Sequence, residues 1–496
     1  MESGINAIFK RLSGDDAKLA LQELKTLLKS DECIDLNNQQ ISVLVGLLDS
    51  DEPKIRQNAA ACLGEARAQD ALGALLKAYK SDETKYNKAV YAGAISKLDF
   101  SSVKDELSAI RQKIVESEHL PEDIKHITAQ MRELNDALRP YDAVSHSFSG
   151  YELINEAVLL TNRNYKEITC NELGKIPNKT FNAGVMVKTK HLDKVLEIRT
   201  FDELLFFPEG IGELPCDPKE AAENICACGI TDYLKKRHTP AEAPFYFRVE
   251  YKNRDGDAKS RAAFEKAFAA QLELGSKWQL INSVDSYELE FRLVEGSNGR
   301  LKPLIGMRTL KDERFAYRKK SISTGMKPYL AALLVRLSSG FVKDNAVVMD
   351  MMCGSGIFLI EREMLRPCRM LYGIDIYGQA IDAARENIRA AGKERKTELI
   401  TRDLHDFTFK HEVDEIYADT PAVSANRSAG ELSGLIECFF KKSAQFLATD
   451  GHVFVYTHNA ELIRSIAIKH GFVLTDSFEI SKLEKSRYIV FSRARV

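Results

Sequence analysis

The sequence predicts a multidomain protein in which an all-α repeat region is followed by an α+β module and then by an α/β domain with a parallel sheet. Three observations predict this. Helical segments repeat in the first hundred residues, strands and helices mix in the middle, and strand and helix alternate from about residue 311 onward. With 496 residues the chain exceeds the roughly 250 to 300 residues at which one hydrophobic core stops growing. Several cores are therefore expected.

The composition is that of an ordinary globular protein and argues against a membrane protein. Hydrophobic residues make up 44% and charged residues 29% of the chain, and no apolar run approaches the roughly 20 residues that cross a bilayer. The start, MESGINAIFKRLSGDD, has no apolar stretch behind a basic segment, so we expect a cytoplasmic location. The net charge of −2 gives no general attraction to nucleic acid, so RNA contact would need local basic patches.

The nine cysteines are scattered along the chain without a paired C-x-x-C set, and we interpret them as reduced thiols. Cys226 and Cys228 are the pair whose spacing could suggest a metal. We expect no metal site there.

The first hundred residues contain a helical repeat. An apolar helix end followed by Ser-Asp-Glu occurs three times, and Ser-Asp-Glu is a good N-cap combination for a following helix. Similar helices follow two of the copies, offset by 31 residues. The repeats are LKTLLKSDE (24–32), LVGLLDSDE (44–52) and LLKAYKSDE (75–83), and the helices are 53–67 and 84–98. Such a period predicts a solenoid of stacked helix pairs.

This pattern resembles bacterial HEAT repeats, and we assign residues 1–140 to a HEAT-like domain. The resemblance implies a platform that docks a protein partner. A purely structural helical cap is the alternative.

Residues 139–152 break the helical period with Pro, Gly and Ser, so a domain boundary is expected there. From 153 to 310, short β-rich runs mix with helical spacing at 222–236 and 259–274. The predicted strands are EAVLLTN (156–162), GVMVKT (184–189), KVLEIRT (194–200), FYFRVEYK (245–252), YELEFRLVE (287–295) and LKPLIGMRT (301–309). The element order and the string VDSYELEFRL resemble a THUMP domain with its ferredoxin-like piece, as found in RNA-modifying enzymes.

The THUMP resemblance implies a module, residues 153–310, that holds structured RNA through basic side chains rather than by reading sequence. Phosphate contact needs only positive charge within reach of the RNA backbone. The candidate residues are Lys235, Lys236, Arg237, Lys252, Arg254, Lys259 and Arg261. Each could instead be an ordinary solvated surface residue.

From residue 311 to 496, five predicted strands alternate with helices, and the first four end in acids. NAVVMDMMCGSGIFLIERE (345–363) reads as a buried strand, an acid, a glycine turn and a helix. The next strands are MLYGIDI (370–376), KTELITRDLHDF (396–407, ending at Asp403), EIYADTPA (415–422) and TDGHVFVYT (449–457), after an Asp-Gly turn. A closing hairpin follows. A dehydrogenase is disfavoured because the turn reads C-G-S-G and not G-x-G-x-x-G.

This order resembles the Rossmann-like class I S-adenosylmethionine methyltransferases, and DMMCGSGIFLIE (350–361) is similar to the D-P-x-C-G-S-G-T-x-x-I-E string of the RNA guanine-N2 group. The resemblance implies S-adenosylmethionine as cofactor. It implies that Asp350, Cys353, Gly354 and Gly356 surround the methionine part, that Asp375 holds the ribose, and that Asp403 binds the adenine amine beside Leu404. Asp375 and Asp403 could instead cap helices. Residues 315–338 resemble the segment that covers the cofactor, with Pro328 starting a helix.

The strand end ADTPA resembles the catalytic loop of enzymes that methylate an exocyclic amine. Such a nitrogen shares its lone pair with the ring, so catalysis needs acceptors that hold its N–H groups opposite the methyl donor. Asp419, the Thr420 carbonyl and Pro421 match these functions, but Ala422 stands where an aromatic ring stacks the base. Losing such a ring costs about 1 to 3 kcal/mol. Tyr417 is near in sequence but is expected to point into the sheet.

We therefore predict an S-adenosylmethionine-dependent RNA methyltransferase that forms N2-methylguanosine. Structured tRNA is favoured over rRNA because the chain has one RNA-holding module and no obvious second catalytic domain. A non-catalytic RNA-binding or assembly protein that retains the cofactor pocket is the main alternative. Methylation of a protein held by the solenoid is a third hypothesis.

Overall fold

The computed structural model describes residues 2–12, 14, 16–30, 34–142, 144–254, 256–323, 325–422 and 428–494. The chain forms two compact units. The first unit contains Met1–His146, Glu213–Lys235 and Thr239–Lys302, and the second contains Ser147–Gly212, Lys236–His238 and Pro303–Val496. The module predicted at 153–310 is divided between the two units, so its boundaries as a family domain remain a prediction.

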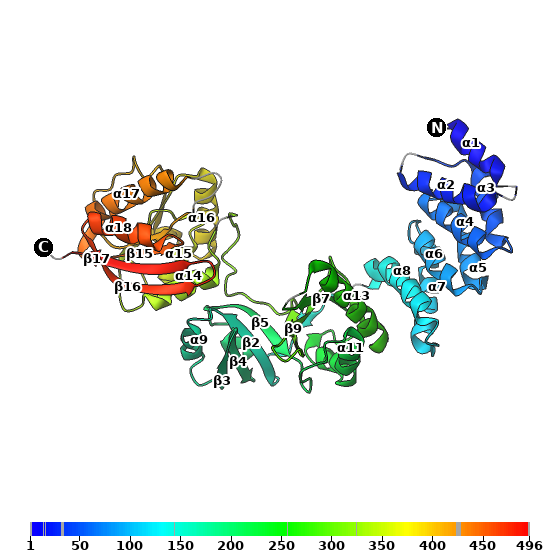
Figure 1. The fold of residues 1–496 in the computed structure, drawn as a ribbon, viewed down its shortest axis with the longest axis horizontal. Coiled ribbons are helices and arrows are strands. Elements are labelled where there is room, and N and C mark those ends of the chain that lie inside the picture. The colour runs from blue at the N-terminus through cyan, green and yellow to red at the C-terminus, as the bar shows by residue number, and fades with distance from the viewer. Residues whose placement is uncertain are drawn as a thin grey trace. The chain divides into compact units, whose positions relative to one another are not determined.

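The first unit begins with a two-layered stack of helices (Figure 1). α2, α4, α6 and α8 pack one against the next, and α1, α3, α5 and α7 each pack on the helix that follows. Their bounds are α1 Glu2–Arg11, α2 Ala17–Ser30, α3 Asn38–Gly46, α4 Pro53–Glu65, α5 Leu72–Ser81, α6 Lys85–Ile95, α7 Lys104–Glu116 and α8 Ile124–Asp142. This is the stacking that the sequence repeat predicts, and the assignment to HEAT repeats remains a prediction.

The Ser-Asp-Glu motifs do not cap α4 and α6. The N-cap residues Glu52 and Thr84 make no side-chain cap hydrogen bond. Asp82 instead lies buried and accepts two hydrogen bonds from Arg56 on α4, at 2.8 and 3.0 Å, and one from Tyr91 on α6 at 2.9 Å. At 81–83 the N-cap prediction was wrong because Asp82 joins neighbouring repeats, a role that local sequence does not reveal, and Asp31 and Glu32 of the first copy lie outside the described residues.

The rest of the first unit is an α/β piece in which β7 lies between β8 and β9, parallel to both. α11 and α12 precede it, and α13 packs on α11 and on β7. The bounds are α11 Pro218–Ala227, α12 Ile230–Lys235, β7 Phe245–Lys252, α13 Ala258–Gly275, β8 Leu280–Asn282 and β9 Leu289–Glu295. The single helix predicted over 222–236 is two helices, separated at Cys228 and Gly229, where Gly229 has a φ of +71°.

The second unit starts with an antiparallel sheet, in the order β3-β4-β2-β5-β10. The bounds are β2 Asn155–Thr161, α9 Lys166–Leu173, β3 Asn178–Phe181, β4 Gly184–Thr189, α10 Leu192–Val195, β5 Phe201–Phe207 and β10 Leu301–Met307. The strand predicted at 194–200 is wrong. Leu192, Val195 and Ile198 are buried at a spacing of three, which fits a helical turn and not a strand, and the strand is the following segment β5.

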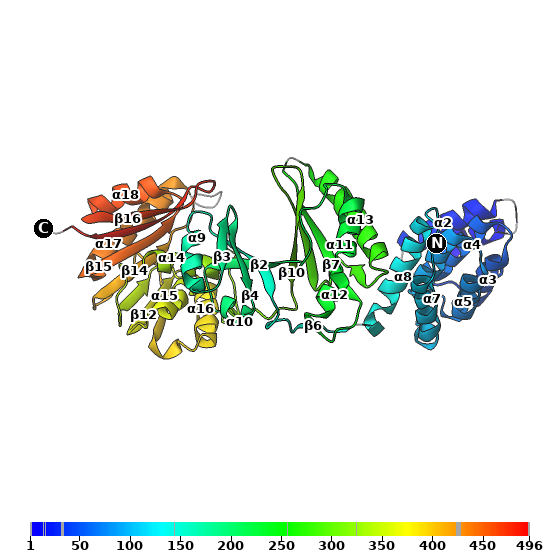
Figure 2. The ribbon, with the colours of Figure 1, turned by 90° about the horizontal axis from the view of Figure 1, so that it is seen from below.

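A seven-stranded sheet forms the rest of the second unit, in the order β13-β12-β11-β14-β15-β17-β16 (Figures 1 and 2). The strands from β13 to β15 are parallel, and β16 and β17 form the predicted antiparallel hairpin. The bounds are β11 Val347–Asp350, β12 Met370–Asp375, β13 Thr397–Thr401, β14 Val413–Asp419, β15 Leu447–Thr457, β16 Phe472–Ser481 and β17 Ser486–Arg493.

Helices cover both faces of this sheet. α17 (Ala429–Phe446) and α18 (Ala460–Lys469) share one hydrophobic core with the strands, and α14 (Pro328–Leu337), α15 (Ile357–Leu365) and α16 (Gly378–Ala390) share the cores of the other face. α14 starts at Pro328 as predicted. Two predicted strand limits differ, because β13 ends two residues before Asp403 and because Asp450 and Gly451 lie inside β15.

Candidate active site

The residues predicted to bind the cofactor and to catalyse converge on the carboxyl edge of the seven-stranded sheet. β11 lies between β12 and β14, so the chain order reverses at β11 and leaves a crevice beyond the strand ends. Asp350, Asp375 and Asp419 are the last residues of these three strands. Three acids from distant parts of the sequence therefore lie at one edge.

The turn after β11 is shaped for a ligand. Gly354 and Gly356 have φ values of +51° and +77°, a region that side chains with a Cβ rarely adopt. A Cβ on Gly354 would lie 3.1 Å from Ile322, in the segment before α14. The Gly354 N–H donates to Asp375 at 2.9 Å, and the buried Ser355 hydroxyl has no partner among the described residues. The turn, its cover and an unsatisfied polar atom fit a polar ligand in this place.

Asp350 and Cys353 lie buried beneath this turn. Burial raises the pKa of Asp350 to about 8, with the charges of Asp419 and Asp375 acting in the same direction. Burial also raises the pKa of the Cys353 thiol well above its usual value. Asp350 therefore suits a cationic ligand group that would favour its ionised form, whereas Cys353 is a packing residue and not a nucleophile.

Asp375 is held in place by two backbone donors, the N–H groups of Gly354 and Tyr377, at 2.9 and 3.0 Å. It does not cap α16, whose N-cap is Tyr377. The next two side chains, Ile376 and Tyr377, are 54% and 64% exposed. Exposed side chains beside the acid predicted to hold the ribose offer a surface for a flat ring. Sequence patterns do not single these two residues out, although their position directly after the strand-end acid is a usable signal.

Asp403 lies in the loop after β13. Its carboxylate accepts hydrogen bonds from the backbone and ring of His405, at 2.8 and 2.9 Å, and these bonds lower the pKa of Asp403. The Asp403 side chain remains 43% exposed, and Leu404 beside it is buried. Asp403 is thus ionised, and one of its oxygens, Oδ1, is already bonded to His405.

The loop predicted to be catalytic begins at Asp419. Burial raises the pKa of Asp419 to about 7, against a smaller opposing effect of His458. The Thr420 N–H and hydroxyl both donate to the Tyr456 carbonyl on β15, at 3.0 and 3.1 Å. These bonds and Pro421 fix the start of the loop. Residues 423–427 lie outside the described residues.

Tyr417 does not replace the ring that is absent at Ala422. Its ring is buried in the sheet, 4.6 Å from the ring of Phe454 and 4.9 Å from that of Phe358, and its hydroxyl donates to Glu415 at 3.1 Å. The expectation that Tyr417 points into the sheet is confirmed. Ala422 itself is exposed.

Comparison with known families decides the class of this domain. Residues 316–480 match the model of the RMKL-like methyltransferase domain. These residues form a methyltransferase domain similar to the RMKL-like one. They include the Gly354 turn, Asp375, Asp403 and the Asp419 loop.

One curated relative and two solved structures agree with this assignment. The bovine U6 snRNA (guanine-N(2))-methyltransferase THUMPD2 is 32% identical over 100 residues, 20% of this chain and 20% of that protein, so the match spans a fifth of the relative. TrmN from Thermus thermophilus is 18% identical, with a TM-score of 0.52, over 68% of this chain and 99% of its own. SMU.472, complexed with SAH, is 15% identical, with a TM-score of 0.52, over 69% of this chain and 99% of its own. The two structures show the same fold.

The cofactor of this methyltransferase domain is S-adenosylmethionine. The glycine turn and Asp350 would hold its cationic methionine part, Asp375 its ribose hydroxyls, and Asp403 with Leu404 its adenine. These residue assignments remain predictions, and the unsatisfied Ser355 hydroxyl would be a further polar partner for the group.

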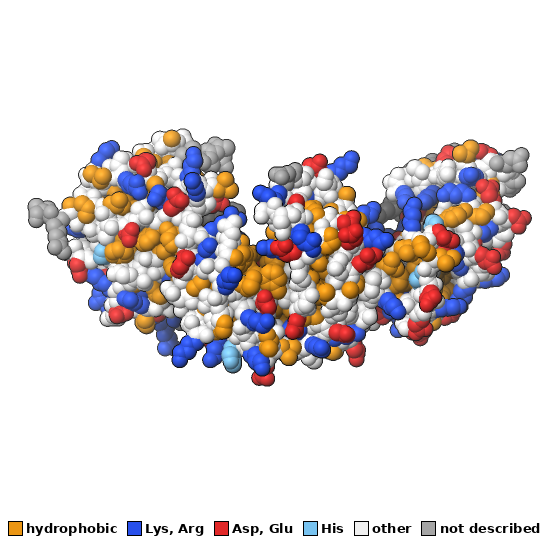
Figure 3. Space-filling model, turned by 60° about the horizontal axis from the view of Figure 1, so that its bottom comes forward, with side chains coloured by type: hydrophobic (Ala, Val, Ile, Leu, Met, Phe, Trp, Pro, Cys, Tyr) orange, Lys and Arg blue, Asp and Glu red, His pale blue; other side chains and the backbone are white. Residues whose placement is uncertain are grey.

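The predicted RNA-binding residues divide into exposed and buried ones. Lys236, Lys252, Arg254, Lys259 and Arg261 are exposed, and the last four flank the connection between β7 and α13. Lys235 is half-buried and donates to Gln279 at 2.7 Å. On the face drawn in Figure 3, basic and acidic side chains are intermixed. Any attraction to RNA is therefore local.

Arg237 is not an RNA-binding residue. Its side chain is 4% exposed, and its guanidinium donates to Asn155 and to the Ile154 carbonyl, at 3.1 and 2.9 Å. A buried guanidinium cannot contact a phosphate, so Arg237 stabilises the fold of the second unit.

Among the described residues, no three His, Cys, Asp or Glu side chains gather into a metal-binding group. Cys226 is half-buried, and burial raises the pKa of its thiol to about 11. None of the helices in these residues combines the length and apolar character needed to cross a bilayer.

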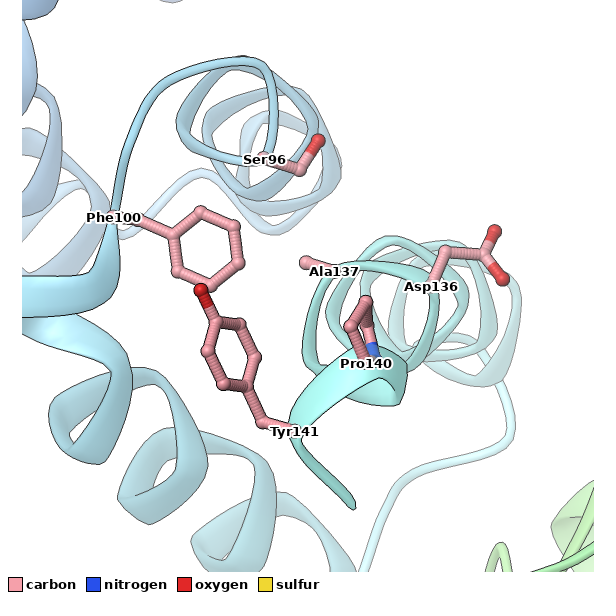
Figure 4. Close-up of a pocket in the computed structure, with 6 residues that line it drawn as sticks. All are labelled: Ser96, Phe100, Asp136, Ala137, Pro140 and Tyr141. Carbon is pink, nitrogen blue, oxygen red and sulfur yellow. The ribbon is translucent and has the colours of Figure 1, made fainter. Parts of the chain in front are cut away.

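A pocket of about 320 Å³ opens on the helical stack, far in sequence from the methyltransferase domain (Figure 4). Phe100 and Tyr141 line it with their rings edge to face, 5.7 Å apart. Ser96, Asp136, Ala137 and Pro140 complete the lining. Tyr141 is 50% exposed.

Proposed function

We propose that this protein methylates guanine N2 in structured RNA, with tRNA as the favoured class. The observation that carries the proposal is the position of Asp419. It ends the strand next to the strand of the glycine turn, so an acceptor for amine N–H groups lies beside the cofactor position. The name of the bovine relative, a guanine-N2 methyltransferase of U6 snRNA, supports the base and an RNA substrate.

The chemistry follows from the amine. Bound S-adenosylmethionine supplies an electrophilic methyl group. The Asp419 carboxylate and the Thr420 carbonyl each accept an N–H of the amine, which directs the nitrogen lone pair out of the base plane. As the N–C bond forms and the S–C bond breaks, the nitrogen becomes cationic and loses a proton to Asp419. A carboxyl group with a pKa near 7 is well matched to take that proton.

The preference for tRNA rests on the sequence argument that one RNA-holding module accompanies one catalytic domain. The exposed basic residues around the β7–α13 connection support an RNA-holding role for that part. The helical stack is proposed to dock a protein partner, and its surface pocket with the exposed Tyr141 supports this.

The alternative is a non-catalytic RNA-binding or assembly protein that retains the cofactor site. Ala422 favours this alternative, because the ring expected to stack the base is absent and Tyr417 is buried elsewhere.

The test is a methyl-transfer assay with three RNA substrates. Purified full-length protein is incubated with methyl-labelled S-adenosylmethionine and, separately, with unmodified tRNA, rRNA and snRNA. We expect label in tRNA above the other two. Label in snRNA or rRNA alone would refute the tRNA preference. No label in any RNA, from protein that binds the cofactor, would favour the non-catalytic alternative.

A further inference from the structure

A second pocket lies at the same edge of the sheet as the Asp419 loop, and we call it the hairpin pocket. It has a volume of about 570 Å³, within the roughly 300 to 1,000 Å³ typical of ligand sites. It lies between the start of α18 and the β16–β17 hairpin. Its lining consists of His458, Asn459, Ala460, Glu461, Leu462, Glu479, Ser481, Lys482, Lys485, Ser486 and Arg487.

His458 connects this pocket to the catalytic loop. Asp419 at the end of β14 pairs with Tyr456 on β15. His458 lies two residues after Tyr456 and Ala422 lies three residues after Asp419, so both lie beyond the same edge of the sheet. The electrostatic effect of His458 also lowers the pKa of Asp419. His458 Nδ1 lies 3.0 Å from the backbone carbonyl oxygen of Glu484 in the hairpin turn. Because a carbonyl oxygen only accepts hydrogen bonds, Nδ1 carries the proton and donates it. The ring also lies edge to face on Tyr456, with centroids 5.6 Å apart.

The other wall of the pocket carries three basic side chains, Lys482, Lys485 and Arg487, and one acid, Glu479. Lys482 and Lys485 are exposed in the hairpin turn and form no ion pair with the residues that the structure describes, whereas Arg487 lies 4.0 Å from Glu479. The N-cap of α18, Asn459, makes no side-chain cap bond, so N–H groups at the helix start are available as donors. Lysine ammonium groups and a helix N-terminus are both suited to phosphate.

The hairpin is also attached to the small antiparallel sheet of the same unit. Asn162 and Asn164 donate to the carbonyls of Ile480 and Glu479, both at 2.9 Å. The Tyr165 ring lies 6.2 Å from Phe478. The basic turn is thus held on a hairpin with support on both sides, and not on a free loop.

We propose that the hairpin pocket binds the RNA strand next to the target nucleotide. In this arrangement Lys482 and Lys485 contact the RNA backbone, and the His458 ring contacts the target base in the place that Ala422 leaves without a ring. Histidine is one of the side chains on which unstacked RNA bases pack. The inference rests on the proposed function for the identity of the base, and it answers how a loop without its aromatic residue can act on one.

The first test separates the pocket from general surface charge. Lys482→Ala with Lys485→Ala is compared with Lys410→Ala with Lys441→Ala, two exposed lysines of the same domain. Lys410 precedes β14 and therefore lies toward the opposite edge of the sheet. The pocket pair should raise KM for the RNA and lower the magnitude of the salt slope by about 0.7 to 0.9 for each lost contact, with KM for S-adenosylmethionine unchanged. Equal effects of both pairs would overturn the backbone contact.

The second test concerns His458. His458→Ala should lower kcat about five- to more than a hundredfold, the range expected for loss of one base-stacking ring. His458→Phe should restore much of the rate, and His458→Gln should not. Full kcat in His458→Ala, or rescue by Gln rather than Phe, would overturn the stacking role. Thermal unfolding of each variant identifies a change that merely destabilises the fold.

If the wild-type protein methylates no RNA, the proposed function fails and the pocket is tested by binding. A fluorescently labelled, unmodified tRNA transcript is titrated with each variant in the presence of SAH. Weaker binding by the pocket pair than by the control pair would support the RNA contact without catalysis. Equal binding would overturn it.

Discussion

The ionisation of Asp419 should govern the pH dependence of methyl transfer. Burial raises its pKa to about 7, and the groups that act on it or lie beside it are His458, Asp350 and Tyr456. Only the ionised carboxylate accepts an amine N–H with either oxygen and can take the amine proton. The ionised form predominates above the pKa, so the rate should rise with pH through about 7.

The magnitude follows from the titration. For a pKa of about 7, about one tenth of the carboxyl groups are ionised at pH 6 and about nine tenths at pH 8. The rate of transfer should therefore rise about tenfold between pH 6 and pH 8. Asp419→Asn keeps an oxygen acceptor but does not titrate, so it should be slower at pH 8 and nearly independent of pH.

The assay is single-turnover transfer at saturating S-adenosylmethionine and RNA, from pH 5.5 to 9, for the wild type and Asp419→Asn. Saturation removes the pH dependence of binding from the rate. A wild-type rate that is flat across pH 7 would refute the reasoning, as would a variant that keeps the tenfold rise.

Three further predictions concern the cofactor site, the basic residues and the support of the helix after the glycine turn. Asp350 should be largely protonated at pH 7, because its pKa is about 8, and cofactor binding should release about one proton. Calorimetry in two buffers of different ionisation enthalpy measures this, and Asp350→Asn should abolish the release. Arg237→Ala should lower the free energy of unfolding by about 1 to 3 kcal/mol through loss of buried hydrogen bonds, measured by urea denaturation, whereas Lys236→Ala should leave it within about 0.5 kcal/mol. Glu361→Gln should lower the melting temperature, because buried Glu361 accepts two hydrogen bonds from Arg199, at 2.7 and 2.8 Å, and an unchanged melting temperature would contradict this.

Much of the methyltransferase domain could be predicted from sequence because its signals are local. A buried strand, an acid and glycines with positive φ follow one another within a few residues, and the structure places Asp350, Gly354 and Gly356 as that pattern predicts. The strand order is not local, but a parallel sheet brings the ends of β11, β12 and β14 to one edge. The three acids therefore meet there.

The errors arose where distant residues decide the outcome. Arg237 reads as one more cation in a basic run, and its burial depends on Asn155, which is far from it in sequence. Asp82 reads as a helix cap, and its actual partner is Arg56 in the preceding repeat. The hairpin pocket was not predicted because the pairing of β14 with β15 brings His458 to the edge of Asp419, and the pairing of β15 with β17 brings the hairpin turn with Lys485 beside His458.

The most direct measurement is the identity of the methylated nucleoside. The protein is incubated with methyl-labelled S-adenosylmethionine and unmodified tRNA, the RNA is digested to nucleosides, and the labelled product is identified by mass spectrometry, with Asp419→Ala as control. The account predicts label on N2-methylguanosine, lost in Asp419→Ala. Label on another nucleoside, or label on N2-methylguanosine that persists in the variant, would contradict it.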